Sequence, residues 1–163
     1  MIRFVLIIII TLLIPFKSLA QSILKDNDEK SIIGVLKAQQ NAWNEGNIEE
    51  FMKGYIKSKN LVFNSSTGPH FGWLSVRDRY KWRYPTKERM GKLTFKVQKI
   101  SSVSENVAQL LGKFNLFFPS KCFKIFKNFK NCEDQEINGF FTLLWVKTEN
   151  GWLILSDHTS RAD

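Results

Sequence analysis

Hydrophobic residues recur at helical spacing in the first part of the chain. Between about Ser22 and Asn44 the apolar positions follow one stripe, at Ile32, Ile33, Leu36 and Trp43. This period predicts one long amphipathic helix, which Gly46 ends in the left-handed conformation. Asn47 then predicts the start of a second helix, because Asn47 and Glu50 have the spacing of a capping box.

A short strand and a third helix are expected next. Residues 61–64 are apolar enough for a strand, and the turn-rich residues 65–69 end it. Ser75 predicts the N-cap of a helix that Pro85 ends. The helix buries Val76, Tyr80 and Tyr84 on one face. The opposite face carries Arg77, Arg79, Lys81 and Arg83, and we expect it to be solvated, with anion binding as the alternative.

Beyond Gly91 the hydrophobic period changes to two residues, which is typical of strands. One alternating strand starts near Leu93, and a second covers residues 108–118, with Gly112 indicating a bulge or bend. Two further apolar runs flank Asn150-Gly151, a pair that favours a two-residue hairpin turn with Lys147 and Trp152 near its tip. Helices followed by a long antiparallel sheet indicate an α+β fold with the helices on one sheet face.

The first 20 residues have the pattern of a secretory signal peptide. A basic start is followed by an apolar run from Phe4 to Ile14 and by Ser18-Leu19-Ala20. This pattern predicts cleavage near Ala20 and a periplasmic or extracellular protein, with residues 21–163 as one domain. An uncleaved membrane anchor is the alternative, but the run is shorter than the roughly 20 residues that span a bilayer.

The chain is basic, with a formal net charge of +9. Cleavage would remove Arg3 and Lys17 and no acid, which leaves +7. A basic excess can indicate nucleic-acid binding, but an exported protein rarely meets nucleic acid. We therefore expect no nucleic-acid partner, and instead attraction to anionic surfaces or ligands, or solubility alone.

Cys122 and Cys132 are the only cysteines. In an oxidising compartment they predict a disulfide, and two free thiols are the alternative. The segment of residues 121–132 interleaves phenylalanines with Lys121, Lys124, Lys127 and Lys130. It is either a basic, aromatic finger in weak contact with an anionic surface, or a hairpin tip whose phenylalanines fold back on the sheet.

The order and spacing of several short motifs resemble the NTF2-like (nuclear transport factor 2-like) superfamily, also called SnoaL-like or ketosteroid-isomerase-like. The motifs are Ala42-Trp43-Asn44, Gly72-Trp73, Arg79-Tyr80, Tyr84-Pro85, residues 139–143, Gly151-Trp152 and residues 157–160. Within the superfamily, the chain looks most like the exported bacterial branch of the DUF4440 domain. The resemblance implies a curved sheet wrapped around about three helices into a cone with an apolar pocket, and a homodimer formed through the outer sheet face. It leaves the activity open, because this fold carries enzymes, binding proteins and assembly modules.

Nine residues are candidates for lining this pocket: Trp43, Tyr55, Phe63, Trp73, Tyr80, Phe95, Phe114, Asp157 and His158. Aromatic side chains at helix and strand spacing also fit a plain core, so both roles stay open. Residues 61–64 and 114–118 contain no carboxylate where the isomerase branch would place one. This difference argues against steroid-isomerase chemistry.

His158 is the candidate catalytic residue. On a regular strand it shares a face with Trp152 and Ile154, whereas Asp157 points to the other face. If the His158 face is concave, the imidazole can act as a base or donor near neutral pH. The alternative is that residues 157–160 hydrogen-bond one another and close the cone. His70 and His158 are the only histidines and have no ligand spacing, so no metal or other cofactor is expected.

The sequence therefore predicts an exported protein that binds a small hydrophobic or aromatic molecule, without assured catalysis. One alternative is a SnoaL-like isomerase, hydrolase or dehydratase that uses His158 with Tyr55 or Tyr80. Another is an interaction module that uses the sheet face or the Lys/Phe loop 121–132.

Overall fold

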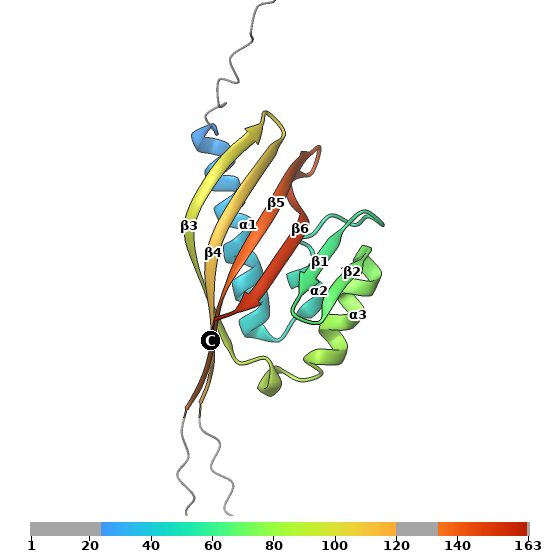
Figure 1. Ribbon diagram of the computed structural model, residues 1–163, viewed down its shortest axis with the longest axis vertical. Coiled ribbons are helices and arrows are strands. Elements are labelled where there is room, and N and C mark those ends of the chain that lie inside the picture. Colours follow the sequence, from blue (N-terminus) through green and yellow to red (C-terminus); the bar gives the residue numbers. More distant parts are fainter. Residues whose placement is uncertain (1–23, 120–133, 163) are drawn as a thin grey trace, which may run out of the picture.

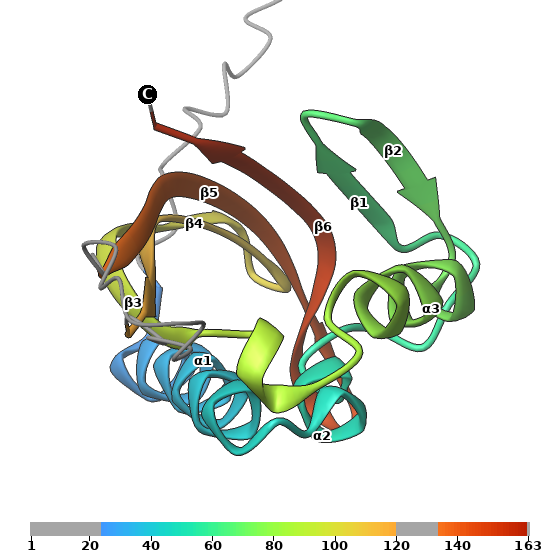
Figure 2. The ribbon, with the colours of Figure 1, turned by 90° about the horizontal axis from the view of Figure 1, so that it is seen from below.

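A curved six-stranded sheet wraps around three α-helices in the computed structural model, which describes residues 24–119 and 134–162. Figure 2 shows the sheet curling over the helices, with α1 (Asp26–Glu45) and α2 (Ile48–Met52) beneath it. Helix α3 (Trp73–Arg83) lies beside the short hairpin of β1 (Val62–Ser65) and β2 (Gly68–Phe71). The α+β cone expected from the sequence is therefore confirmed.

The described elements follow the order of Figure 1. The helices are α1 (Asp26–Glu45), α2 (Ile48–Met52) and α3 (Trp73–Arg83), with a short 3-10 turn at Lys87–Arg89. The strands are β1 (Val62–Ser65), β2 (Gly68–Phe71), β3 (Lys92–Ser104), β4 (Val107–Phe118), β5 (Gln135–Thr148) and β6 (Gly151–Arg161). In the sheet they lie in the order β2-β1-β6-β5-β4-β3.

The sheet is mixed, which corrects the wholly antiparallel expectation. Strands β3 to β6 form antiparallel pairs, but β1 runs parallel to β6, with Phe63 opposite Asp157. The long connection from β1 to β6, through α3 and four strands, permits this parallel pairing. Strand β2 was also missed, because Gly68 and Pro69 indicate a turn; Pro is tolerated here because β2 is an edge strand.

The ends of α1 and α2 follow the sequence signals. Gly46 closes α1 with a φ of 82°, and the Asn47 side chain accepts a hydrogen bond from the Glu50 amide at 3.1 Å. The predicted start of α3 is wrong, because the helix begins at Trp73 and not after Ser75. The Trp73 ring nitrogen donates to the Met52 carbonyl at 3.1 Å, which ties this earlier start to the end of α2.

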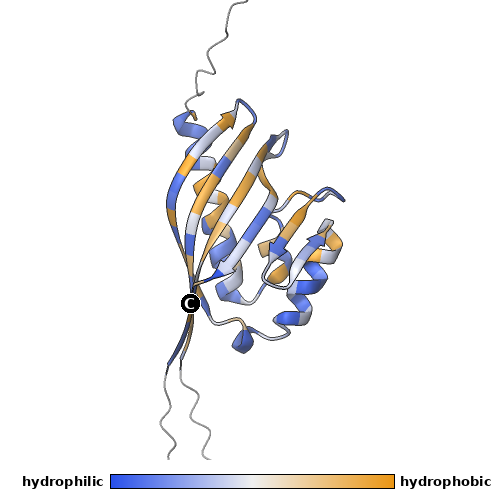
Figure 3. Ribbon diagram, in the orientation of Figure 1, coloured by the Kyte–Doolittle hydropathy of each residue, from blue (hydrophilic) through white to orange (hydrophobic). Residues whose placement is uncertain are grey.

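The core lies between α1 and the concave sheet face. Ile32, Leu36 and Trp43 from α1 belong to the same buried cluster as Leu110 and Trp145 from the sheet. Figure 3 shows hydrophobic and hydrophilic residues alternating along the strands, as expected for a sheet with one buried face.

Side chains of α1 also satisfy the backbone of the edge strand β3. The Asn44 amide donates to the Leu93 carbonyl at 2.9 Å and accepts from the Leu93 N–H at 2.7 Å. Gln40 accepts from the Phe95 N–H at 2.7 Å. These bonds cover part of an edge that would otherwise be open to pairing with another chain.

The β5–β6 hairpin is confirmed, with Lys147 paired to Trp152. Its two-residue turn is Glu149-Asn150 rather than Asn150-Gly151, and Gly151 follows with a φ of 99°. The hairpin tip is anchored to α1, because the Asp28 carboxylate accepts from Lys147 at 2.7 Å and from the Trp152 ring nitrogen at 2.9 Å. These two hydrogen bonds lower the pKa of Asp28.

Several predictions concern residues outside the described ranges: the signal peptide of residues 1–20, the Cys122–Cys132 disulfide and the lysines of the 121–132 loop. In the ranges that are described, no helix has the length and apolar character needed to cross a bilayer.

Gly139 on β5 lies at a position that has no room for a side chain, not even the methyl group of alanine. A Cβ there would lie 2.1 Å from the Ser160 carbonyl oxygen and 2.4 Å from the Phe114 ring. We expect Gly139→Ala to lower the free energy of unfolding by about 1–3 kcal/mol in urea denaturation, because a backbone atom cannot move aside cheaply. Gly34→Ala on α1 is the matched control: nothing lies within 4 Å of its Cβ, so a gain of up to about 1 kcal/mol is expected. Equal effects of the two substitutions would contradict this account.

Candidate functional site

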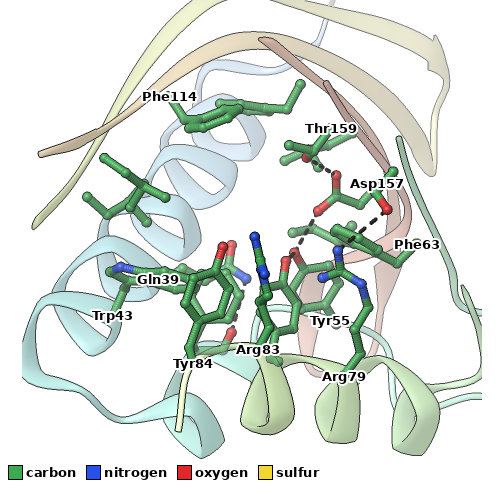
Figure 4. Close-up of a pocket in the computed structure, with 18 of the residues that line it drawn as sticks. Gln39, Trp43, Tyr55, Phe63, Arg79, Arg83, Tyr84, Phe114, Asp157 and Thr159 are labelled. Carbon is green, nitrogen blue, oxygen red and sulfur yellow. Dashed lines mark hydrogen bonds between the residues drawn. The ribbon is translucent and has the colours of Figure 1, made fainter. Parts of the chain in front are cut away.

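A cavity of about 650 Å³ lies between the concave sheet face, α1 and α3. Figure 4 shows Phe114 covering it from the sheet, Trp43 and Gln39 on the α1 side, and Asp157 and Thr159 on the β6 side. This volume lies within the range of roughly 300–1,000 Å³ found for small-molecule pockets.

The floor of the cavity is a cluster of aromatic rings in edge-to-face contact. The Trp43 ring lies 4.7 Å from the Tyr84 ring and 5.2 Å from the Phe51 ring, and Phe51 lies 5.2 Å from Tyr80. The Trp43 ring nitrogen also donates to the Met90 carbonyl at 3.1 Å. These contacts hold the rings in place.

A bulge in β6 decides which polar side chain enters the cavity. Leu144 pairs with Ser156 and Trp145 pairs with Ile154, so Leu155 is an extra residue without a partner on β5. An extra residue reverses the alternation of side chains beyond it. Trp152, Ile154 and Asp157 are consequently all buried, although a regular strand would place Asp157 on the opposite face.

Asp157 is the buried polar centre of the site, with only 4% of its surface exposed. Tyr55 donates to one carboxylate oxygen at 2.7 Å, and Thr159 donates to the other at 2.7 Å. The Tyr80 hydroxyl lies 3.4 Å from the Tyr55 hydroxyl. Because the Tyr55 proton points to Asp157, Tyr80 is the donor of that second contact.

Burial sets the protonation of these groups. It raises the pKa of the Asp157 carboxyl, against the opposing effects of the Tyr55 and Thr159 hydrogen bonds and the nearby Arg79 charge. Burial, together with the Asp157 charge, also raises the pKa of both Tyr55 and Tyr80. The two phenols are therefore neutral donors, and Asp157 is a carboxyl that takes up a proton more readily than an exposed one.

Seven of the nine predicted residues line the cavity: Trp43, Tyr55, Phe63, Tyr80, Phe95, Phe114 and Asp157. Trp73 does not, because its ring lies under Lys57 and Arg77 and its nitrogen bonds to α2. The expected facing of β6 is wrong: His158 is exposed on the outer side, so its imidazole does not enter the cavity. The bulge at Leu155 is the physical reason.

The sequence predicts Arg79 and Arg83 on a solvated face of α3; Arg83 is exposed as expected, but Arg79 is half-buried. Both line the cavity, and Figure 4 shows both side chains rising from α3 toward its interior. The Arg79 guanidinium lies 4.5 Å from the Phe63 ring centre and 3.5 Å from the Ser65 hydroxyl. The sequence held the signal, because residues 76, 79, 80 and 83 follow the helical stripe i, i+3, i+4, i+7.

Other polar lining residues lie outside the predicted set, namely Gln39, Ser65, Ser66, Thr67, His70, Tyr84 and Arg161. Thr159, from the polar segment 157–160 that the sequence singles out, also lines the cavity. Several come from the β1–β2 hairpin, which was itself only half predicted. Across the part of the chain that the structure describes, no three His, Cys, Asp or Glu side chains gather where they could hold a metal ion.

Comparison with solved structures identifies relatives of this fold. The chain is 32% identical to an NTF2-like protein of unknown function from Shewanella oneidensis MR-1, with a TM-score of 0.68 over 81% of this chain and 98% of that one. A ketosteroid isomerase-like protein from Erwinia carotovora atroseptica is 12% identical, with a TM-score of 0.66 over 85% and 99% of the two chains. An NTF2-like superfamily protein from Salmonella enterica serovar Typhimurium is 17% identical, with a TM-score of 0.64 over 84% and 92%.

No family model matches the sequence, and no curated protein matches it. The finer resemblance to the DUF4440 branch is therefore not confirmed. The two structures below 25% identity share the fold and carry no argument about activity.

The hydrogen bond from Tyr55 to Asp157 predicts that the protein becomes less stable when the Tyr55 hydroxyl is removed. Tyr55→Phe leaves a buried carboxylate oxygen without its donor, so we expect the free energy of unfolding to fall by roughly 1.5–3 kcal/mol at neutral pH. Tyr84→Phe removes the same atom from a cavity ring that does not contact Asp157, and it should change stability far less. Urea denaturation of both variants checks this, and equal losses would argue against the assigned role of Tyr55.

The raised pKa of Asp157 predicts a particular pH dependence of stability. The folded state holds this proton more tightly than the unfolded state, whose value is near 3.8. The contribution of Asp157 to the free energy of unfolding should therefore fall as the pH rises from about 3.8 through the raised pKa. Asp157→Asn lacks this titration, so the stability of the natural protein relative to this variant should decline across that window. A difference that stays constant with pH would contradict the raised pKa.

Proposed function

The chain belongs to the NTF2-like superfamily, and on that premise we propose that it binds a small hydrophobic or aromatic molecule inside its cone. The observation that supports this most is the cavity of about 650 Å³, whose lining combines aromatic rings with converging polar groups. Such a combination is typical of small-molecule sites, where apolar walls supply affinity and a few polar groups fix orientation.

The aromatic lining suits a flat ligand. Phe114 and Phe95 face the cavity from the sheet, and the Phe95 ring is held 5.2 Å from the Phe141 ring. Trp43 and Tyr84 form the opposite wall (Figure 4). A planar molecule between these walls would bury both of its faces, while a polar substituent could reach Tyr80, Thr159 or Asp157.

Proton transfer by Asp157 is a second candidate function. A buried carboxyl with a raised pKa in a cavity is a common feature of general acids and bases. We rank it below binding, because both oxygens of Asp157 already accept hydrogen bonds from Tyr55 and Thr159. The enzyme alternative that relied on His158 loses its basis, since that imidazole lies on the exposed side of β6.

Export and dimerisation are part of the proposal. Export is supported by the signal-peptide pattern of residues 1–20 alone. A dimer through the outer sheet face is supported by the exposed side chains of Leu111 and Phe140, which alternate along β4 and β5 with the buried Leu110 and Phe141. The third alternative, an interaction module, would use this same face or the 121–132 loop.

Titration with N-phenyl-1-naphthylamine, a neutral aromatic fluorophore, tests the binding proposal. We expect saturable, one-to-one binding with a rise in fluorescence. Ile137→Trp places a large ring at a half-buried cavity position and should abolish binding. Val103→Trp adds the same ring at a position that is 63% exposed, and it should bind as the natural protein does. Absence of saturable binding, or equal binding by the Ile137→Trp variant, would overturn the proposal.

A further inference from the structure

We propose that the bound molecule is an amphipathic monoanion, a carboxylic acid on an aromatic or polycyclic body, whose acid group lies between Arg79 and Arg83. This inference rests on the proposed function, because it names the class of molecule that the same cavity accepts. It is carried by the arrangement of charged side chains on α3.

Arg79 and Arg83 are one helical turn apart and point to the same side of α3. Both line the cavity, and Figure 4 shows them side by side between Tyr84 and Asp157. Residues at i and i+4 on a helix are close enough for their side chains to hold one group together. Arg161, at the end of β6, also lines the cavity and adds a third cation.

The cations of α3 divide into two sets. The outward-facing side chains are paired: Arg77 with Asp78 at 2.7 Å, and Lys81 with Glu49 at 2.5 Å. Neither Arg79 nor Arg83 forms an ion pair with any residue that the structure describes. The two inward-facing guanidinium groups are thus left for an external anion.

Arg79 has the greater need of a polar partner, because it is half-buried and Arg83 is exposed. Its protein contacts are the Phe63 ring at 4.5 Å, the Tyr80 ring at 5.8 Å and a long contact of 3.5 Å to the Ser65 hydroxyl. These contacts orient the group and leave most of its five N–H donors unused. A partly desolvated guanidinium gains most from an ionised acceptor.

Asp157 does not neutralise this set. Its two oxygens accept from Tyr55 and Thr159, and no ion pair joins it to Arg79. Burial also raises the pKa of the Asp157 carboxyl. Three arginines against one carboxyl give a cavity that attracts anions.

The arginines indicate an oxyanion, and the surroundings favour a singly charged one. A guanidinium fork matches the two oxygens of a carboxylate. Aromatic and aliphatic side chains form much of the rest of the wall, which favours an apolar body for the molecule. A second negative charge would lie near Asp157. An aromatic or polycyclic acid satisfies both conditions.

A matched pair of fluorophores tests this inference. 8-Anilinonaphthalene-1-sulfonate has the ring system of N-phenyl-1-naphthylamine with one sulfonate added, so it stands in for the proposed monoanion. We expect the natural protein to bind the anionic probe roughly tenfold more tightly than the neutral one, the gain typical of a charge-assisted hydrogen bond. The advantage should shrink as sodium chloride is added.

Variants locate the effect. Arg79→Gln and Arg83→Gln should each weaken the anionic probe about tenfold and change the neutral probe less than about threefold. Arg83 is exposed, so its variant keeps the test valid should Arg79→Gln fail to fold. Arg77→Gln removes a cation of the same helix that lies outside the cavity, and it should change neither affinity.

The outcomes separate this inference from the proposed function. Tight neutral-probe binding with no preference for the anion, or no effect of either cavity arginine, would overturn the anion inference and leave the binding cone standing. An equal loss of anion affinity in Arg77→Gln would also overturn it, because the effect would then be general charge. Failure of the neutral probe would overturn the proposed function itself. Anion binding that survives Ile137→Trp would place the anion outside the cavity and overturn the inference.

Discussion

One extra residue in β6 fixes the geometry on which the cavity depends. At Leu155 the strand leaves the register of β5, while on its other side Ile154 exchanges backbone hydrogen bonds with the segment that follows α2, through Gly54 and Ile56 at 2.9 Å each. This docking brings Tyr55 beside β6, and the bulge turns Asp157 toward it. The 2.7 Å contact between them needs both features. Without the bulge, either the hydrophobic core residues of β6 or the polar centre of the cavity would face solvent.

The second constraint is the rotation of α3 about its own axis. Val76 and Tyr80 anchor the helix in the core, and the helical period then directs Arg79 and Arg83 along the same side. Trp73 holds the first turn through its bond to Met52. The same turns of α3 therefore place a tyrosine ring and two guanidinium groups beside the cavity.

Much of this fold could be predicted from the sequence, since Gly46, Asn47 and the period change after Gly91 are local signals that the structure obeys. The bulge could not, because Leu153, Ile154 and Leu155 are all apolar and give no alternation from which to detect an extra residue. Regular alternation therefore predicts the wrong member of the Asp157-His158 pair on the inner face. The place of the two arginines beside the cavity was not predicted for a different reason. The helical stripe that contains Val76 also contains Arg83, but a charged side chain is normally expected to face solvent.

The separation of charge in the cavity supports the proposed anionic ligand. If stability alone mattered, Arg79 and Asp157 would gain from a direct ion pair, since leaving buried charges unpaired costs free energy. Instead, the neutral hydroxyls of Tyr55 and Thr159 donate hydrogen bonds to the carboxyl group. The Arg79 guanidinium lies over the Phe63 ring. An internal ion pair would have left no cation available to an incoming molecule. Keeping the two apart preserves a free cationic donor set beside an aromatic wall, and an amphipathic acid is the class of molecule that uses both.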